Sequence, residues 1–246
     1  MYVVPLSAVP DADPRSVGGK ARSIGRMMRS GLPVPDGLCV TDAGLRDLSS
    51  ADLEAELTEE LRRLRAATVA VRSSAGSEDS STHSYAGIFK SFLNVDKRTD
   101  AVIAALEGVR ESADGPVVRA YERAVESTNP SMAAVVQEMI EPLWSGVMFT
   151  SDPVASNDHI LIEATSGAVA AGSSAQPSPE YAAVDRAGSV VPGSSSPGFS
   201  AVRAFVDDLV AISRRCEQLF GNPQDIEWVW DGGRVWVLQS RTITTP

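Results

Sequence analysis

Apolar positions along the chain follow two spacings, one helical and one extended. Leu53, Leu57, Leu61 and Leu64 recur every three or four residues in "DLEAELTEELRRLRAA", which predicts an amphipathic helix. The next stretch, "TVAVRSS", is a short run rich in apolar residues, and such a run predicts a buried strand.

The stretch "GGKARSIGRMMRSGLPVPDGLCVT" near the N-terminus predicts a glycine turn, a short helix and a strand. Ile24, Met27 and Met28 share one face of this helix, and Lys20 falls at its N-terminus. Gly31 can end the helix, and the prolines that follow lead into a strand through Val40.

The rest of the chain mixes strand and helix signals. "FLNV" and "MAAVVQEM" predict strands, residues 99–127 and 203–220 predict helices, and "SGVMFTSDP" and "HILIEA" extend this mixed pattern. Because strands and helices alternate without a long repeat, the pattern favours an α/β or an α+β fold. Residues 164–200 are rich in Ala, Ser, Gly and Pro, which predicts a loop or a frayed segment.

The C-terminal stretch "DIEWVWDGGRVWVLQSRT" predicts a hairpin, and the length of its turn decides which side chains share a face. With a two-residue loop, Glu227 and Gln239 would lie on opposite faces. A three-residue loop, 232–234, places Glu227 opposite Gln239 and Asp225 opposite Arg241. This second register separates polar from apolar side chains, because the other face then holds Trp228, Trp230, Trp236 and Leu238.

The second register also brings together a carboxylate and an amide oxygen, Glu227 and Gln239. Mg2+ prefers oxygen ligands and binds through few protein groups together with substrate phosphates, so this pair suits Mg2+. Arg241 beside the pair could hold a phosphate. The alternative for the same residues is a solvated hairpin face with a weak surface ion pair.

A second candidate site is the stretch "AVRSSAGSEDSSTHSYAG", residues 70–87. Arg72 supplies a planar cation suited to phosphate or carboxylate, and the serines and glycines that follow leave backbone amides accessible to a ligand. The pattern therefore predicts a phosphate cradle. The alternative is a plain surface connection, which Ser/Gly-rich loops after strands usually form.

Charge and composition limit the classes of function. The 246 residues carry a formal net charge of -10, which opposes long-range attraction to nucleic acid or to an anionic membrane. The start of the chain has no basic leader and no apolar run of membrane length, which predicts a soluble, cytoplasmic protein. Cys39 and Cys216 lie far apart without CxxC spacing, so neither a disulfide framework nor a structural zinc site is expected.

Four stretches, in order, resemble the ATP-binding domain of the phosphoenolpyruvate synthase, pyruvate phosphate dikinase and rifampicin phosphotransferase family. They are "VGGKARSIGRM", "VAVRSSAGSEDSSTHSYAGIFKSFLNV", "MAAVVQEMIEPLWSGVMFTSDPV" and "DIEWVWDGGRVWVLQSRT". The resemblance implies an α+β ATP-grasp fold with the nucleotide in the cleft between two lobes. We expect an N-terminal lobe over residues 1–128 and a C-terminal lobe over residues 129–246.

The resemblance also implies roles for individual residues. It places Lys20 and Arg72 on the phosphates of ATP, Glu227 and Gln239 on Mg2+, and Arg241 on the phosphates again. We further expect a glycine loop to cover the phosphates, Gln137 to approach adenine, and Met139 to offer backbone contacts. The residues implied for the glycine loop are Gly87, Ser91 and Phe92.

Two departures from the family pattern bear on activity. The segment that normally reads close to EAAWGLGEAVVSG is "EATSGAVAAGSSA" here, with Ser166 in place of an aromatic residue and Ala170 in place of a glutamate. The connection between "GLCVT" and "TVAVRSS" is also shorter than usual. His83 and His159, the only histidines, lack the family's phosphohistidine context and are expected to be loop residues.

The resemblance implies an ATP-dependent phosphotransferase. Its phosphoryl acceptor would be a small molecule or a histidine on a separate carrier protein, with no nucleic-acid or membrane partner. Two other hypotheses stay open. One is an ATP-grasp ligase that activates a carboxylate as an acyl phosphate, and the other is a degenerate ATP-binding subunit without catalysis.

Overall fold

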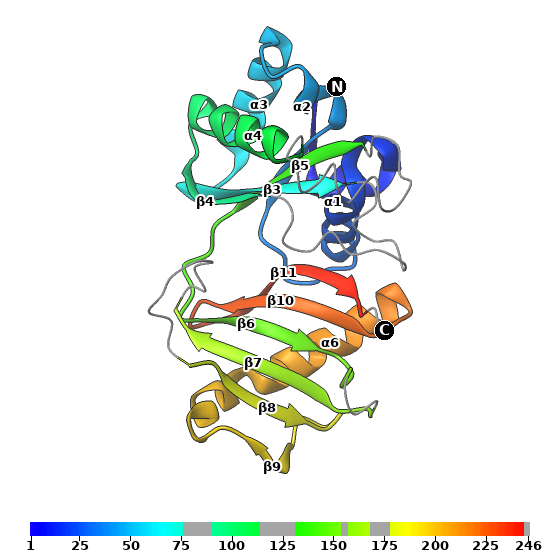
Figure 1. The fold of residues 1–246 in the computed structure, drawn as a ribbon, viewed down its shortest axis with the longest axis vertical. Helices are drawn as coiled ribbons and strands as arrows, with labels where there is room; N and C mark the ends of the chain where they lie inside the picture. The colour runs from blue at the N-terminus through cyan, green and yellow to red at the C-terminus, as the bar shows by residue number, and fades with distance from the viewer. Residues whose placement is uncertain (76–89, 114–130, 154–156, 168–177, 244–246) are drawn as a thin grey trace. The chain divides into compact units, whose positions relative to one another are not determined.

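The computed structural model describes residues 1–75, 90–113, 131–153, 157–167 and 178–243 (Figure 1). The chain divides into two compact units. Unit 1 comprises Met1–Arg29 and Pro35–Met139, and unit 2 comprises Ser30–Val34 and Ile140–Pro246. This division falls further along the chain than the expected lobe boundary at 128/129. Both units combine helices with an antiparallel sheet, which confirms the α+β class.

Unit 1 is built on a five-stranded antiparallel sheet in the order β1-β2-β5-β3-β4. Its central strand β5 reads "MAAVVQE" and is buried on both faces over its first six residues. β4 forms one edge and pairs Phe92 with Val71 and Ser91 with Arg72. The strands are β1 (Val3–Pro5), β2 (Gly37–Val40), β3 (Thr68–Ala75), β4 (Ser91–Asp96) and β5 (Met132–Glu138).

Helices cover both faces of this sheet. On one face lie α2 (Asp42–Arg46), α3 (Ala51–Arg63) and α4 (Thr99–Ala113), as Figure 1 shows. Leu53, Leu57 and Leu61 of α3 are at most 2% exposed and pack with alternate residues of β3 and β5, so the predicted amphipathic helix is confirmed. α4 covers the first half of the helix predicted over residues 99–127, and the rest of that range lies outside the described residues.

The other face of the unit 1 sheet is covered by α1 (Pro14–Arg29) and the short helix η1 (Leu6–Asp11). Ile24 and Met27 of α1 are fully buried, as the sequence predicted, while Met28 is half-buried. The helical path of α1 is broken at Gly18, whose φ is +74°. The predicted glycine turn therefore lies inside this helical stretch, and Lys20 begins its second part.

Unit 2 contains a six-stranded antiparallel sheet in the order β11-β10-β6-β7-β8-β9. One face packs against the helix α6 (Val206–Phe220) and the preceding 3-10 helix η2 (Pro197–Phe205). Phe205 stacks on Trp230 at 4.6 Å between ring centroids, and it meets Trp228 edge-on at 5.7 Å. The strands are β6 (Trp144–Phe149), β7 (Ile160–Ser166), β8 (Glu180–Val184), β9 (Val190–Ser195), β10 (Gln224–Trp230) and β11 (Val235–Thr242).

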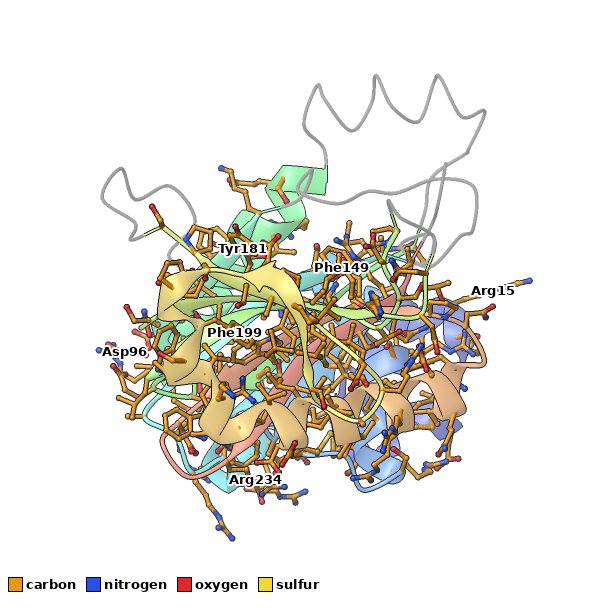
Figure 2. All side chains as sticks on the ribbon, turned by 90° about the horizontal axis from the view of Figure 1, so that it is seen from below. Arg15, Asp96, Phe149, Tyr181, Phe199 and Arg234 are labelled. Atoms are coloured by element: carbon orange, nitrogen blue, oxygen red, sulfur yellow. The ribbon has the colours of Figure 1, made fainter. Side chains whose placement is uncertain are left out.

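The two faces of the unit 2 sheet differ in exposure. Phe199 of η2 is 2% exposed under the sheet, whereas Tyr181 of β8 is 54% exposed; both are labelled in Figure 2. Over β8, the sheet face away from α6 is therefore open to solvent at Tyr181. Ile226 and Trp228 of β10 point toward α6. The residues that alternate with them along β10 therefore point to the other face of the sheet.

The prediction of a loop or frayed segment over residues 164–200 was wrong at its start, where β7 extends to Ser166, and in its second half; residues 168–177 lie outside the described residues. β8 and β9 lie in the second half, joined by a turn in which Gly188 has a φ of +88°. β9 is the edge of the sheet and contains Pro192, and an edge strand tolerates proline because one of its sides needs no backbone donor. The sequence did not predict β9, because Pro, Gly and Ser interrupt the alternation of apolar and polar residues along it.

The C-terminal hairpin confirms two predicted pairs and corrects the rest. Glu227 pairs with Gln239 and Asp225 with Arg241, but a register shift follows Glu227, and Trp228 then pairs with Val237. The shift leaves Leu238 as an extra residue in a β-bulge, and the loop holds four residues, 231–234, rather than three. Trp236 therefore points to the same face as Glu227, not to that of Trp228.

Both cysteines are fully buried, and burial raises the pKa of each thiol to about 12. Because the thiolate is the reactive form, we expect neither Cys39 nor Cys216 to react appreciably with a disulfide reagent at pH 8 in the folded protein. Counting reactive thiols before and after guanidinium unfolding tests this, with both expected only after unfolding. Rapid labelling of either thiol in the folded protein would contradict the burial.

No helix in the described part of the chain is long and apolar enough to cross a membrane.

Candidate functional site

In unit 1, the turn formed by Gly18, Gly19 and Lys20, called the GGK turn below, places Lys20 next to β3. Its ammonium Nζ donates a hydrogen bond to the backbone carbonyl of Ser73, 2.9 Å away. Lys20 is half-buried, and Ser73 lies next to Arg72 in the "VRSSA" strand. Lys20 of the predicted GGK motif therefore contacts the strand that contains the predicted "VRSSA" motif.

Ser74 fixes this contact. Its hydroxyl donates to the carbonyl of Val17 at 2.8 Å and accepts from the N–H of Ala21 at 3.0 Å, which ties both sides of the turn to β3. A Cβ at Gly18 would lie 2.0 Å from the carbonyl oxygen of Ser74, far inside van der Waals contact. Only glycine allows the turn and the strand to approach this closely.

Arg72 points to the same face of the sheet as Ser74, because side chains two residues apart share a face. This is the face that α1 covers, so Arg72 and Lys20 lie on one side of the sheet. Ser91 is the cross-strand partner of Arg72 on β4 and is exposed. Phe92 points the other way and packs against Gly108 of α4, so its ring belongs to the core. Gly87 lies outside the described residues.

Gln137 lies near the end of β5, and Met139 directly follows this strand. Gln137 shares the face of Arg72 and is 2% exposed, and its side-chain amide donates to the carbonyl of Pro35 at 3.3 Å. The N–H of Met139 donates to the carbonyl of Thr68 at 3.1 Å. That donor is therefore engaged within unit 1.

In unit 2, Glu227 and Gln239 lie side by side on the sheet face away from α6. The amide oxygen Oε1 of Gln239 is buried and has no hydrogen-bond partner within the described part of the chain. A buried oxygen without a donor is costly, and a cation would satisfy it. The donor set of one carboxylate and one amide oxygen therefore fits Mg2+.

Arg241 is held by Asp225, directly across the hairpin. Its Nε donates to the Asp225 carboxylate at 2.8 Å, and a second guanidinium nitrogen lies 2.6 Å from the same oxygen. The Asp225 side chain is 9% exposed and that of Arg241 is 43% exposed. The buried carboxylate thus orients a cation whose outer side remains open to solvent.

The sequence did not single out Glu163 of β7, which the sheet register places on the same face. Glu227 pairs with Val147 of β6, and Val147 pairs with Glu163, so Gln239, Glu227 and Glu163 lie in one row across four strands. Glu163 is exposed. The alternation of "ILIEATS" carried this signal, because Ile160, Ile162 and Ala164 are buried and the residues between them face outward.

The other candidate residues that the structure describes, His159 and Ser166, belong neither to the Lys20 and Arg72 group nor to the Glu227 and Gln239 pair. His159 lies in the connection before β7, where its backbone N–H donates a hydrogen bond to the side-chain oxygen Oδ1 of Asn157 at 2.9 Å. Ser166 ends β7, and His83 and Ala170 lie outside the described residues. No group of three or more His, Cys, Asp or Glu side chains suited to a metal ion occurs among the residues that the structure describes.

Comparison with known proteins connects these groups to one family. The model of the pyruvate phosphate dikinase AMP/ATP-binding domain matches residues 45–188 and 179–246. The prodigiosin synthesizing transferase PigC of Serratia marcescens is 30% identical over 99% of this chain and 33% of its own length. A probable phosphoenolpyruvate synthase of Archaeoglobus fulgidus is 29% identical over 100% of this chain and 42% of its own.

A rifampicin phosphotransferase of Streptomyces sviceus is 30% identical, over 99% of this chain and 36% of its own length. The chain thus spans well under half of each of these relatives. Their alignments run to between 296 and 316 positions, although the chain has 246 residues, so the relatives contain segments that it lacks. This agrees with the short connections expected from the sequence.

Among solved structures, PH1788 from Pyrococcus horikoshii Ot3 matches with a TM-score of 0.53 and 12% identity, over 97% of this chain and 95% of that one. This likeness concerns the fold alone. The family match covers both units, including the "VRSSA" strand of Arg72 and the hairpin of Glu227, Gln239 and Arg241. The chain therefore belongs to the family of the pyruvate phosphate dikinase AMP/ATP-binding domain.

Proposed function

We propose that the protein binds ATP with Mg2+ as an ATP-grasp unit and transfers a phosphoryl group from it. The observation that carries the proposal is the buried, unpartnered Oε1 of Gln239 beside the carboxylate of Glu227. In a family defined by its AMP/ATP-binding domain, this pair would hold the metal that accompanies the nucleotide.

Phosphoryl transfer depends on positioning and charge neutralisation more than on covalent chemistry by the protein. Lys20 and Arg72 of unit 1 would bind phosphate oxygens, and Ser74 would keep the lysine in place through the GGK turn. In unit 2, Asp225 would hold the guanidinium of Arg241 toward the transferred phosphoryl group. Mg2+ on Glu227 and Gln239 would neutralise the charge that develops on the phosphate oxygens.

The remaining proposed roles belong to residues of unit 1. Ser91 lies beside Arg72 and would donate its hydroxyl to a phosphate, and the loop that includes Gly87 would cover the phosphates. Gln137 would line the adenine side, with the carbonyl of Met139 as an acceptor for the adenine amino group. The backbone of Phe92, rather than its core-packed ring, would face the nucleotide.

The acceptor is a small molecule or a histidine on a separate carrier protein. Small-molecule acceptors are supported by relatives named rifampicin phosphotransferase and phosphoenolpyruvate synthase.

The first test is calorimetric titration of ATP, with and without Mg2+, into the wild type and Arg72→Ala. We expect Mg2+ to tighten ATP binding in the wild type. Loss of a charged hydrogen bond to phosphate is expected to weaken binding about 10- to 100-fold in Arg72→Ala. Arg65→Ala is the matched control, because Arg65 is an exposed arginine of the same unit, and it should bind ATP as the wild type does.

The same samples, analysed by chromatography after long incubation, give the products. Slow release of AMP supports dikinase-like transfer, and release of ADP supports transfer of the terminal phosphoryl group. Absence of ATP binding in the wild type would overturn the proposal and leave a degenerate subunit. Formation of an amide with ADP from a supplied carboxylate and amine would instead identify a ligase.

A further inference from the structure

The hairpin of β10 and β11 carries Glu227 and Gln239, the metal pair, between two other groups on the same sheet face. On the side away from the turn lies Arg241 with its ion pair. On the side of the turn lies Trp236, which pairs with Val229 of β10. Val229 and Glu227 are two residues apart along β10, so the Trp236–Val229 pair begins about 7 Å from the metal pair.

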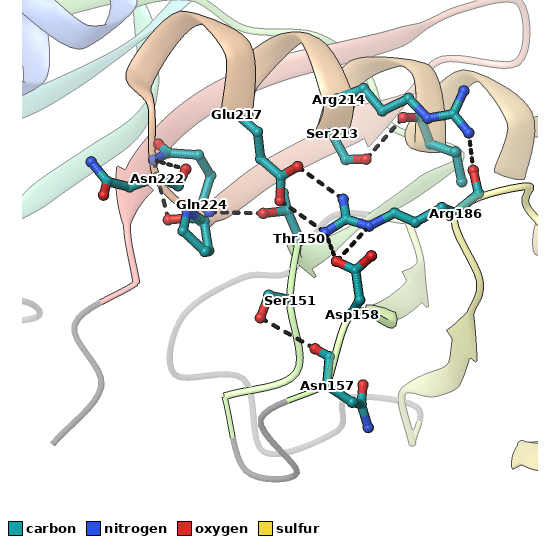
Figure 3. Close-up of polar contacts among 12 residues, drawn as sticks. Thr150, Ser151, Asn157, Asp158, Arg186, Ser213, Arg214, Glu217, Asn222 and Gln224 are labelled. Atoms are coloured by element: carbon teal, nitrogen blue, oxygen red, sulfur yellow. Dashed lines mark hydrogen bonds and ion pairs between the residues drawn. The ribbon is translucent and has the colours of Figure 1, made fainter.

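Strand β6 fixes this hairpin at both ends. At the end beyond the metal pair, Thr150 and Gln224 are joined by two hydrogen bonds of 2.8 Å, and Figure 3 shows the one that the Thr150 hydroxyl accepts. At the turn end, the backbone N–H of Leu143 donates to the carbonyl of Trp230 at 2.8 Å. The groups on the hairpin face therefore keep their spacing within unit 2.

The two sides of the metal pair differ in chemistry. The side away from the turn carries the ion pair of Asp225 and Arg241, and the Arg241 side chain is 43% exposed. The turn side is apolar: Val229 is 5% exposed, and Leu238, two residues from Trp236, is half-buried. Charged phosphates are therefore favoured on the first side and an uncharged planar group on the second.

The turn itself holds the indole of Trp236 in place. The indole Nε1–H donates to Oδ2 of Asp231 at 2.8 Å, and the guanidinium carbon of Arg234 lies 4.4 Å from the ring centroid, over one face. The other carboxylate oxygen of Asp231 accepts the backbone N–H groups of Gly233 and Arg234. The hydrogen bond from Trp236 is the main cause that holds the pKa of Asp231 below its ordinary value. The carboxylate therefore stays ionised at neutral pH, and the half-buried ring stays oriented.

The proposed phosphate contacts decide which way a nucleotide runs along this face. With Mg2+ on the metal pair and Arg241 on phosphate oxygens, the phosphates take the side away from the turn. The base then extends toward the turn. Trp236 is within its reach there, because the ribose and the first phosphate of a nucleotide span a separation of this size. Every base has a flat face that can stack on an aromatic ring.

We propose that Trp236 stacks on the base of the bound nucleotide, and that Asp231 and Arg234 position the indole for this contact. The inference rests on the proposed function. It assigns the turn side of the hairpin to the base and the opposite side to the phosphates. Asp231 is a positioning residue, because it acts on the base only through the indole.

The test compares ATP with inorganic tripolyphosphate, which carries the phosphates without a base, in calorimetric titrations of the full chain with Mg2+. The wild type is expected to bind ATP more tightly than tripolyphosphate. Trp236→Leu is expected to weaken ATP binding about 5- to 100-fold, the effect of losing one stacked base, with tripolyphosphate affinity within about twofold of the wild type. Trp236→Phe keeps an aromatic ring and should bind ATP within about threefold of the wild type.

Phe149→Leu is the matched control. Phe149 of β6 pairs with Asp225, so it is a half-buried aromatic residue of the same face on the other side of the metal pair, and its variant should bind both ligands as the wild type does. Asp231→Ala should weaken ATP binding less than Trp236→Leu and leave tripolyphosphate binding in place, a selectivity that a general loss of folding would not produce. Added to Trp236→Leu, it should have no further effect.

Equal weakening of ATP and tripolyphosphate binding in Trp236→Leu would overturn the inference, and so would equal affinity of the wild type for the two ligands. Loss of ATP affinity in Phe149→Leu but not in Trp236→Leu would also overturn it, because the base would then lie on the other side of the metal pair. A wild type that bound neither ligand would instead overturn the proposed function.

Discussion

Replacing Gly18 by alanine is expected to destabilise the protein by about 2–4 kcal/mol, which would lower its melting temperature by roughly 5–12 °C. Two effects add. A side chain at a φ of +74° costs about 1 kcal/mol, and the new Cβ would lie 2.0 Å from the Ser74 carbonyl oxygen. The turn must then separate from β3, which also displaces Lys20 from Ser73. Thermal and urea unfolding followed by circular dichroism measure the change.

Gly221→Ala separates the two effects. Gly221 ends α6 with a φ of +79°, but nothing lies within 4 Å of the position that its Cβ would take. This variant should therefore lose only about 1 kcal/mol and should bind ATP as the wild type does. Gly18→Ala should in addition bind ATP more weakly. If the two variants lost equal stability, the close approach of the GGK turn to β3 would have no energetic role.

The parts of the fold that could be predicted from sequence are those in which one strong local pattern agrees with the tertiary packing. The leucines of α3 recur at helical spacing and are buried, and "TVAVRSSA" and "MAAVVQE" are nearly continuous buried strands at the centre of a covered sheet. The Glu227–Gln239 pair was also predicted correctly, because the extra loop residue and the bulge at Leu238 together leave these two residues opposite each other, as in the predicted three-residue loop.

Other features depend on contacts that no local pattern contains. The bulge at Leu238 changes the faces of Trp236 and its neighbours, yet "RVWVLQS" alternates too weakly to reveal an extra residue. β9 is stabilised as an edge strand by pairing with β8, although Pro192 and Gly193 interrupt its pattern. The row from Gln239 to Glu163 needs the strand order β11-β10-β6-β7.

The proposed division of roles gives the metal pair of unit 2 and the phosphate-binding cations of unit 1 different experimental signatures. Lys20 and Arg72 would act on ATP with or without Mg2+, because their charges are fixed in unit 1. Glu227 and Gln239 would act only through the metal, because a carboxylate repels bare phosphate. A variant of unit 2 should therefore change the dependence of ATP binding on Mg2+, whereas a variant of Arg72 should weaken binding in both conditions.

Glu227→Gln is accordingly expected to abolish the tightening of ATP binding by Mg2+ while leaving metal-free binding unchanged or slightly stronger. It should also lower nucleotide turnover about 100- to 1000-fold, the effect of losing one preorganised electrostatic group. The substitution keeps the size of the side chain, so the Glu227–Val147 pairing of the sheet should persist and the melting temperature should stay close to that of the wild type.

Binding of Mn2+ in place of Mg2+, followed by the electron paramagnetic resonance signal of free Mn2+ in the presence of ATP, reports the metal site directly. Glu141→Gln, an exposed glutamate of unit 2, is the matched control and should retain wild-type metal binding. Glu163→Gln tests whether the row extends to β7, and a partial loss would add a second carboxylate to the site. Retention of full metal binding in Glu227→Gln would mean that the buried oxygen of Gln239 is satisfied by something other than a cation shared with residue 227.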